Sequence, residues 1–205
     1  MEEKDVYKEL SSIRDIMERS SKFISLSGLA GILTGLYALI GARFAFRLLD
    51  NQTSIDNGVS TINEQVVLVP MIVIGLAVLT LSGITAFWLT MRKAKGQHIQ
   101  VWNSVSRRML AAILIPMITG GIIIALEIMK GAYMAIPSVC LVFYGLGLVA
   151  GSQYTYSDVK WLGVGEIILG LIALYIPEHG ILLWAIGFGV LHILYGTIMY
   201  FKYER

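Results

Sequence analysis

The stretch WLGVGEIILGLIALYIPEHGILLWAIGFGVLHILYGTIMY (161–200) contains two long apolar runs joined by a short turn at Pro177. An α-helix rises about 1.5 Å per residue, so about 20 apolar residues cross the hydrocarbon core of a bilayer. Each of the two runs approaches this length. The stretch therefore predicts two helices that cross a membrane in opposite directions.

The rest of the chain continues this pattern. Its 205 residues are 56% hydrophobic and 15% charged, with a mean hydropathy of +0.72, which is too apolar for a water-soluble domain. We expect an all-α polytopic membrane protein with one six-helix transmembrane domain over residues 23–205. The six spans are predicted near residues 23–46, 66–91, 109–129, 132–152, 160–176 and 180–201.

The distribution of Lys and Arg predicts the orientation. If the amino terminus is cytoplasmic, most of the 16 basic residues lie on the inner side, and only Arg43, Arg47 and Lys130 lie outside. Cytoplasmic loops of membrane proteins carry an excess of Lys and Arg. We therefore expect both termini in the cytoplasm. The basic residues are explained by topology, so no nucleic-acid partner is expected.

Residues 1–22 predict a cytoplasmic amphipathic helix, because apolar side chains recur there at helical spacing and charged side chains fill the other face. Two interpretations are open. The helix can lie on its own bundle or on a second copy of the chain, or residues 1–20 can recruit a separate cytoplasmic protein. Glycine pairs at positions 31 and 35 and at 147 and 151 also favour self-association, because they permit close helix contact.

Two connections between the predicted spans are long. Residues 50–65 are polar and rich in turn formers such as Asn57-Gly58, so we expect an outer loop there. Residues 92–108 form the inner connection, with Ile99, Trp102 and Val105 on one helical face between basic residues. We expect a short helix there at the level of the lipid headgroups.

Several short segments recur along the chain, such as ILTGLYAL (32–39) and IILGLIAL (167–174). The matched positions are Gly28 with Gly163, Gly35 with Gly170, Ile74 to Leu79 (IGLAVL) with Ile186 to Leu191 (IGFGVL), and Tyr144-Gly145 with Tyr195-Gly196. Internal repeats of this kind are common in membrane proteins. They predict three tandem helical hairpins with approximate threefold symmetry.

The last hairpin (161–200), with its two glycine-spaced helices and its turn at Pro177, is similar to the hairpin repeat of the HdeD-type acid-resistance membrane proteins. The resemblance is best in these residues, and the first hairpin departs from it by carrying the long loop 50–65. It implies a six-span protein of a bacterial inner membrane. It also implies a stress-associated or accessory role without catalytic residues.

Glu166 and His192 are the ionisable residues that lie inside the last two predicted spans. Both lie on faces rich in small residues, and their depths along the two helices are compatible with contact. An ionisable group that faced lipid would cost several kcal/mol, so such groups normally face protein or a cavity. The pair is either a polar site that moves a proton or binds a small polar solute, or a structural hydrogen bond between helices.

Further polar residues can be placed near the membrane surfaces. Arg43 and Arg47 end the first predicted span and Glu127 ends the third, which suggests an ion pair on the outer side. Four tyrosines can lend hydroxyl groups to a cavity or anchor the helices at the interface. They are Tyr37, Tyr144, Tyr175 and Tyr195.

Motifs for catalysis, for a cofactor or for a metal are not found in the sequence. His98, His179 and His192 are scattered, and the single Cys140 excludes an intramolecular disulfide. We therefore expect neither an enzyme nor a cofactor. Three functions stay open: a stress-associated or accessory membrane protein, a small proton-linked transporter or channel, and a membrane anchor for a cytoplasmic partner.

Overall fold

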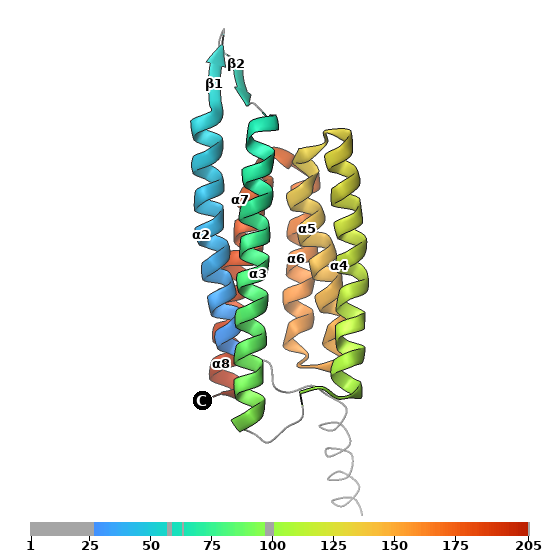
Figure 1. Ribbon diagram of the computed structural model, residues 1–205. Coiled ribbons are helices and arrows are strands. Elements are labelled where there is room, and N and C mark those ends of the chain that lie inside the picture. Colours follow the sequence, from blue (N-terminus) through green and yellow to red (C-terminus); the bar gives the residue numbers. More distant parts are fainter. Residues whose placement is uncertain (1–26, 57–58, 63, 97–100, 205) are drawn as a thin grey trace, which may run out of the picture.

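The computed structural model describes residues 27–56, 59–62, 64–96 and 101–204, and these form a bundle of long helices (Figure 1). The helices and the two strands are α2 (Gly28–Gln52), β1 (Thr53–Asp56), β2 (Val59–Ile62), α3 (Glu64–Gly96), α4 (Ser104–Lys130), α5 (Ile136–Gly151), α6 (Asp158–Tyr175), α7 (Gly180–Trp184), η4 (Ala185–Leu191) and α8 (His192–Tyr203). The segment η4, between α7 and α8, has π-helical geometry.

Five helical segments are long and apolar enough to cross a membrane, as an integral membrane protein requires. They are Gly28–Asn51, Val66–Gly96, Ser104–Lys130, Tyr133–Tyr154 and Pro177–Tyr203, the last of which contains α7, η4 and α8. The helix α6 has 18 residues and carries Asp158, Lys160 and Glu166, so a larger share of its residues is charged than in any of these five. The helices match the six predicted runs in order.

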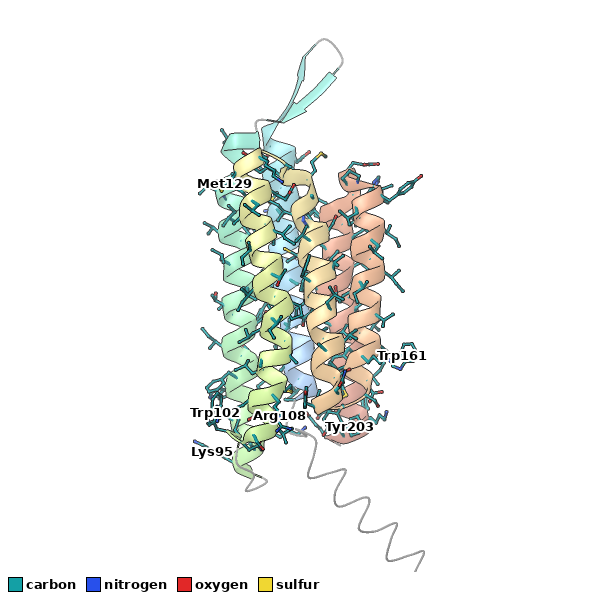
Figure 2. All side chains as sticks on the ribbon, turned by 90° about the vertical axis from the view of Figure 1, so that its right-hand side faces the viewer. Lys95, Trp102, Arg108, Met129, Trp161 and Tyr203 are labelled. Carbon is teal, nitrogen blue, oxygen red and sulfur yellow. The ribbon has the colours of Figure 1, made fainter. Side chains whose placement is uncertain are left out.

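Apolar side chains cover the outside of the bundle (Figure 2). Met129 is 82% exposed at one end and Trp161 is 72% exposed nearer the other. Lys95, Trp102 and Arg108 lie together at the end opposite Met129 (Figure 2). Bases and a tryptophan at one level are typical of a membrane–water interface.

The order of packing follows the hairpins. The helix α2 packs against α3, and α4 packs against α5. The hairpins then meet through α2 with α8 and through α5 with α6, while α6 also contacts η4 and α8. Within the part of the chain that the structure describes, α3 and α4 do not pack closely against each other, and each presents most of its surface outward.

Glycines bring the backbones of these helices together. A β-carbon added at Gly28 on α2 would lie 2.6 Å from the carbonyl oxygen of Gly196 on α8. A β-carbon added at Gly163 on α6 would lie 2.7 Å from the carbonyl oxygen of Gly145 on α5. No other residue fits such a contact without moving a helix, so these positions require glycine.

The contacts between α2 and α8 match those between α6 and α5. Gly35 meets Ile193, and the matched Gly170 meets Val142. Ile193 lies three residues before Gly196, and Val142 lies three residues before Gly145. The two helix pairs therefore use corresponding residues in the same register.

The two long connections differ from expectation. Residues 53–56 and 59–62 form two antiparallel strands with Asp56 opposite Val59, where the sequence predicts a loop. Residues 101–103 form bends where a short helix is predicted, because Asn103 caps α4. Its side chain accepts a hydrogen bond from the backbone N–H of Ser106 at 2.8 Å, and its own N–H donates to the Ser106 hydroxyl at 2.9 Å. Ile99 lies outside the described residues.

Glu204, which follows α8, contacts the start of α2 and the end of α3 at the same end of the bundle. Its carboxylate accepts a hydrogen bond from the backbone N–H of Gly28 at 2.7 Å and pairs with Lys93 at 2.9 Å. A carboxylate at the first residue of α2 is favoured by the helix dipole as well as by the hydrogen bond. The start of α2 and the end of α3 are thereby fixed to the end of α8.

Replacing Gly163 by leucine should separate α5 from α6. Overpacking of this kind lowers the free energy of unfolding by roughly 1–3 kcal/mol, and thermal unfolding of the protein in detergent measures the loss. Gly83→Leu on α3 is the matched control, because a β-carbon at Gly83 meets nothing within 4 Å. Equal unfolding temperatures for the two variants would contradict the backbone contact.

Candidate polar site inside the bundle

Glu166 and His192 meet in the interior of the bundle. Glu166 lies on the face of α6 that also carries Gly163 and Gly170, and all three are buried. Glu166 is 0% exposed and His192, the first residue of α8, is 3% exposed. The Nδ1 atom of His192 lies 3.3 Å from Oε1 of Glu166. The structure thus joins the two residues that the sequence placed at compatible depths.

A third side chain, Tyr144 on α5, completes the cluster. Its hydroxyl lies 2.8 Å from Nε2 of His192, and Nδ1 of the same ring lies 3.1 Å from the carbonyl oxygen of Gly187. A neutral imidazole with its proton on Nδ1 satisfies both contacts, because Nδ1–H donates to the Gly187 carbonyl and Tyr144 donates to Nε2. If Nε2 is also protonated, it donates to the Tyr144 oxygen instead. The ring can therefore hold one proton or two.

Among the described residues, no donor is aligned to form a hydrogen bond with the carboxyl group of Glu166, although Nδ1 of His192 lies 3.3 Å from Oε1. An ionised carboxylate buried without donors costs several kcal/mol, and a charged partner offsets part of this cost. Two states limit the cost: a protonated Glu166 beside a neutral His192, or a carboxylate beside an imidazolium. When the proton of the neutral His192 lies on Nε2, which then donates to the Tyr144 oxygen, Nδ1 is free to accept the proton of Glu166, and this transfer interconverts the two states.

The π-helical segment η4 supplies the carbonyl that orients His192. It occupies Ala185–Leu191 and ends where His192 begins. Short π segments within α-helices are frequent at functional sites. Gly187 within it lies against the cluster, because an added β-carbon there would meet the Glu166 carboxylate and would lie 2.6 Å from Cδ2 of Leu141.

Aromatic rings enclose one side of the cluster. The Phe188 ring lies with its centroid 4.9 Å from that of Tyr144 and 5.8 Å from that of His192. Trp184 packs on the same Phe188 ring at 5.0 Å. These rings keep the surroundings of the imidazole apolar, which strengthens each electrostatic interaction inside.

The predicted outer ion pair is not formed. Glu127 pairs with Lys130 at 3.4 Å within α4, and neither Arg43 nor Arg47 pairs with it in the described structure. The reason is the packing order, since α2 lies against α3 and α8 and does not pack closely against α4. Both arginines are exposed at the end of α2.

Other residues singled out in the sequence give no second site. His179 is exposed and lies 3.8 Å from the exposed Glu178 in the turn before α7. His98 and the segment 1–20 lie outside the described residues. Among the residues that are described, no group of three His, Cys, Asp or Glu side chains is placed to hold a metal ion.

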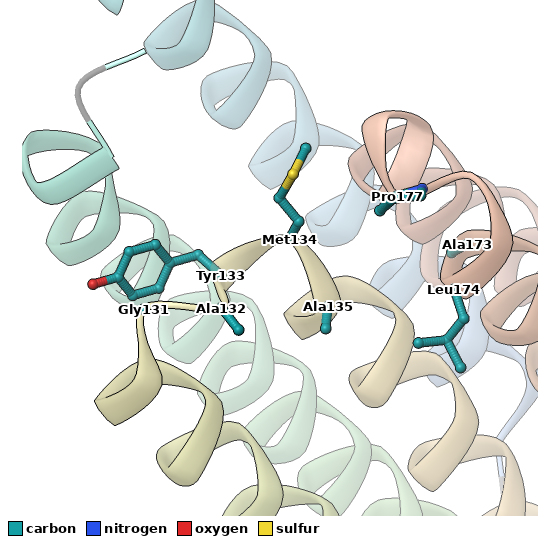
Figure 3. A pocket seen from close by; sticks show the side chains of 8 residues that line it. All are labelled: Gly131, Ala132, Tyr133, Met134, Ala135, Ala173, Leu174 and Pro177. Atoms are coloured by element: carbon teal, nitrogen blue, oxygen red, sulfur yellow. The ribbon is translucent and has the colours of Figure 1, made fainter. Parts of the chain in front are cut away.

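A pocket of about 400 Å³ opens at the end of the bundle away from Glu204 (Figure 3). Gly131, Ala132 and Met134 border it on the turn between α4 and α5, and Leu174 and Pro177 border it beyond the end of α6. Its side chains are mostly apolar, and no charged side chain lines it. Of the side chains that line the pocket, Tyr133 alone carries a hydroxyl group.

The sequence predicts two of the three side chains in the cluster, Glu166 and His192. It names Tyr144 as one of four tyrosines that can lend a hydroxyl group to a cavity, and the local sequence does not distinguish it from Tyr37. The contact of the Gly187 carbonyl with His192 depends on the path of the backbone, which the local sequence does not give. No known protein family, curated protein or solved structure matches this chain, so the cluster is interpreted from its own geometry.

Replacing Gly187 by alanine should displace the carboxylate of Glu166. The crowding should lower the free energy of unfolding by roughly 1–3 kcal/mol, as measured by thermal unfolding in detergent. Gly75→Ala on α3 is the matched control, because Gly75 occupies the same place in IGLAVL as Gly187 does in IGFGVL and has nothing within 4 Å of an added β-carbon. A loss of similar size in both variants would show that Gly187 does not crowd the cluster.

Proposed function

We propose that this protein is a small proton-linked transporter or channel whose proton-binding centre is the cluster of Glu166, His192 and Tyr144. The observation that carries the proposal is the direct contact of a fully buried carboxylate with an imidazole, at 3.3 Å, in a bundle of membrane-length helices. A carboxylate and an imidazole exchange a proton readily, and ionisable residues inside membrane bundles are typical of proton pathways.

A comparison of the two similar helix interfaces favours this function over a purely structural hydrogen bond. Three residues after Gly28 and after Gly163 stand Gly31 and Glu166, respectively. The interface between α2 and α8 thus has a glycine where the interface between α6 and α5 has the acid. At this position the first interface packs through Gly31 without a carboxylate, so packing alone does not require Glu166.

The same comparison applies to the imidazole. Three residues before Tyr195 stands His192, and three residues before the matched Tyr144 stands Leu141, which is fully buried. A leucine therefore serves at the corresponding position of α5. Each of the two interfaces therefore carries one polar residue at a position where the other carries an apolar one, so the shared packing arrangement requires neither Glu166 nor His192.

The topology belongs to the same proposal. We place α6 across the membrane with the five more apolar segments, which gives six spans in three tandem hairpins and both termini in the cytoplasm. The corresponding glycine contacts of α2 with α8 and of α6 with α5 support the repeat. The resemblance of residues 161–200 to HdeD-type proteins supports a bacterial inner membrane.

Proton flux into liposomes that contain the purified protein tests the function. With an imposed potential that drives protons inward, the wild-type protein should acidify the interior faster than protein-free liposomes, and Glu166→Gln should abolish the difference. Glu178→Gln is the matched control, because Glu178 also lies beside a histidine but is exposed. It should keep the wild-type rate.

Two results would contradict the proposal. Wild-type liposomes that acidify no faster than protein-free ones would exclude proton transport under these conditions. Equal rates for wild type and Glu166→Gln would leave the cluster a structural contact between helices.

A further inference from the structure

The buried cluster can exchange protons with water only through other groups in the bundle. Toward the outer end of α6, the next buried residues are Gly170 and Ala173, neither of which has a side chain that carries a proton. Toward the other end of α6 and α8, in contrast, the side chains include several tyrosines and an aspartate. Toward the outer end α5 adds one buried hydroxyl, that of Ser138, so the longer series of polar side chains leads to the end where Asp158 lies.

The first polar side chain in that direction is Tyr195 on α8. The cluster reaches α8 through His192, whose Nε2 is hydrogen-bonded to the Tyr144 hydroxyl. Tyr195 follows His192 by three residues, so the two side chains lie on one face of α8. The interior cluster is thus continued along α8 by a phenol.

The hydroxyl of Tyr195 is buried and has no hydrogen-bond partner among the described residues. A buried hydroxyl without a partner costs about 1–3 kcal/mol, so its presence is not explained by packing. Lys202 and Tyr203, which both contact Asp158, follow Tyr195 along α8 by seven and eight residues, which is about two helical turns. Tyr195 therefore stands between the cluster and a second group of polar side chains.

That second group reaches the surface. Tyr203 donates a hydrogen bond to Asp158 at 2.9 Å, and Lys202 pairs with the same carboxylate at 3.0 Å. The Tyr156 ring packs on the Tyr203 ring with centroids 4.1 Å apart. The Lys202 side chain is 51% exposed, and Tyr203 lies at the end of the bundle (Figure 2). Protons from water can reach Asp158 directly.

We infer that Tyr195 links the buried cluster to Asp158, so that protons enter and leave the cluster at the end of the bundle formed by Asp158 and Tyr203. This inference rests on the proposed function. In each transfer the Tyr195 oxygen receives one proton and releases its own, so one O–H bond forms as another breaks and the phenol keeps no charge. A water molecule can bridge the gaps on either side of the hydroxyl.

Tyr195→Phe tests the link, because it removes the hydroxyl and keeps the ring. Its rate of proton flux in liposomes should fall at least tenfold, while its unfolding temperature should not fall, since the lost hydroxyl makes no hydrogen bond. Tyr175→Phe is the matched control and should keep the wild-type rate, because Tyr175 is 88% exposed on the outside of α6.

The outcomes separate this inference from the proposed function. If Glu166→Gln abolishes flux while Tyr195→Phe keeps the wild-type rate, the cluster carries protons by another route and the inference is wrong. If Glu166→Gln itself keeps the wild-type rate, the proposed function fails and the inference fails with it.

Discussion

Direct contact between helix backbones is the constraint on which this structure depends. In a bilayer, helices gain little by burying apolar side chains against one another, because lipid is equally apolar, so they associate through close packing and polar contacts. Here Gly28 lies against Gly196, and Gly163 lies against Gly145. These contacts hold α2 on α8 and α5 on α6, and thereby fix the faces between which any interior group must fit.

The polar cluster follows from that close packing. Glu166 lies on the same face of α6 as Gly163 and Gly170, so the contact that brings α5 near also encloses the carboxylate. The π geometry of η4 then turns the Gly187 carbonyl toward the ring of His192. A carboxylate, an imidazole and a phenol thus share a space enclosed by helices, where charge is costly and a mobile proton lowers that cost.

The sequence predicted the helices well and the cluster in part. Run lengths near 20 residues give the helices, and helical depth gives the contact between Glu166 and His192. Local sequence does not contain the order in which helices pack, and for this reason the ion pair predicted for Glu127 with Arg43 and Arg47 is wrong. The strands at residues 53–62 were missed, although Asn57-Gly58 is a strong hairpin signal.

Infrared titration of the protein in liposomes tests most directly whether Glu166 and His192 share a proton. We expect a carboxylic acid band that titrates with pH and that is absent in Glu166→Gln. The midpoint of this titration should shift in His192→Gln, because the two groups are in contact at 3.3 Å. A spectrum that Glu166→Gln leaves unchanged, or a midpoint that His192→Gln does not move, would contradict it.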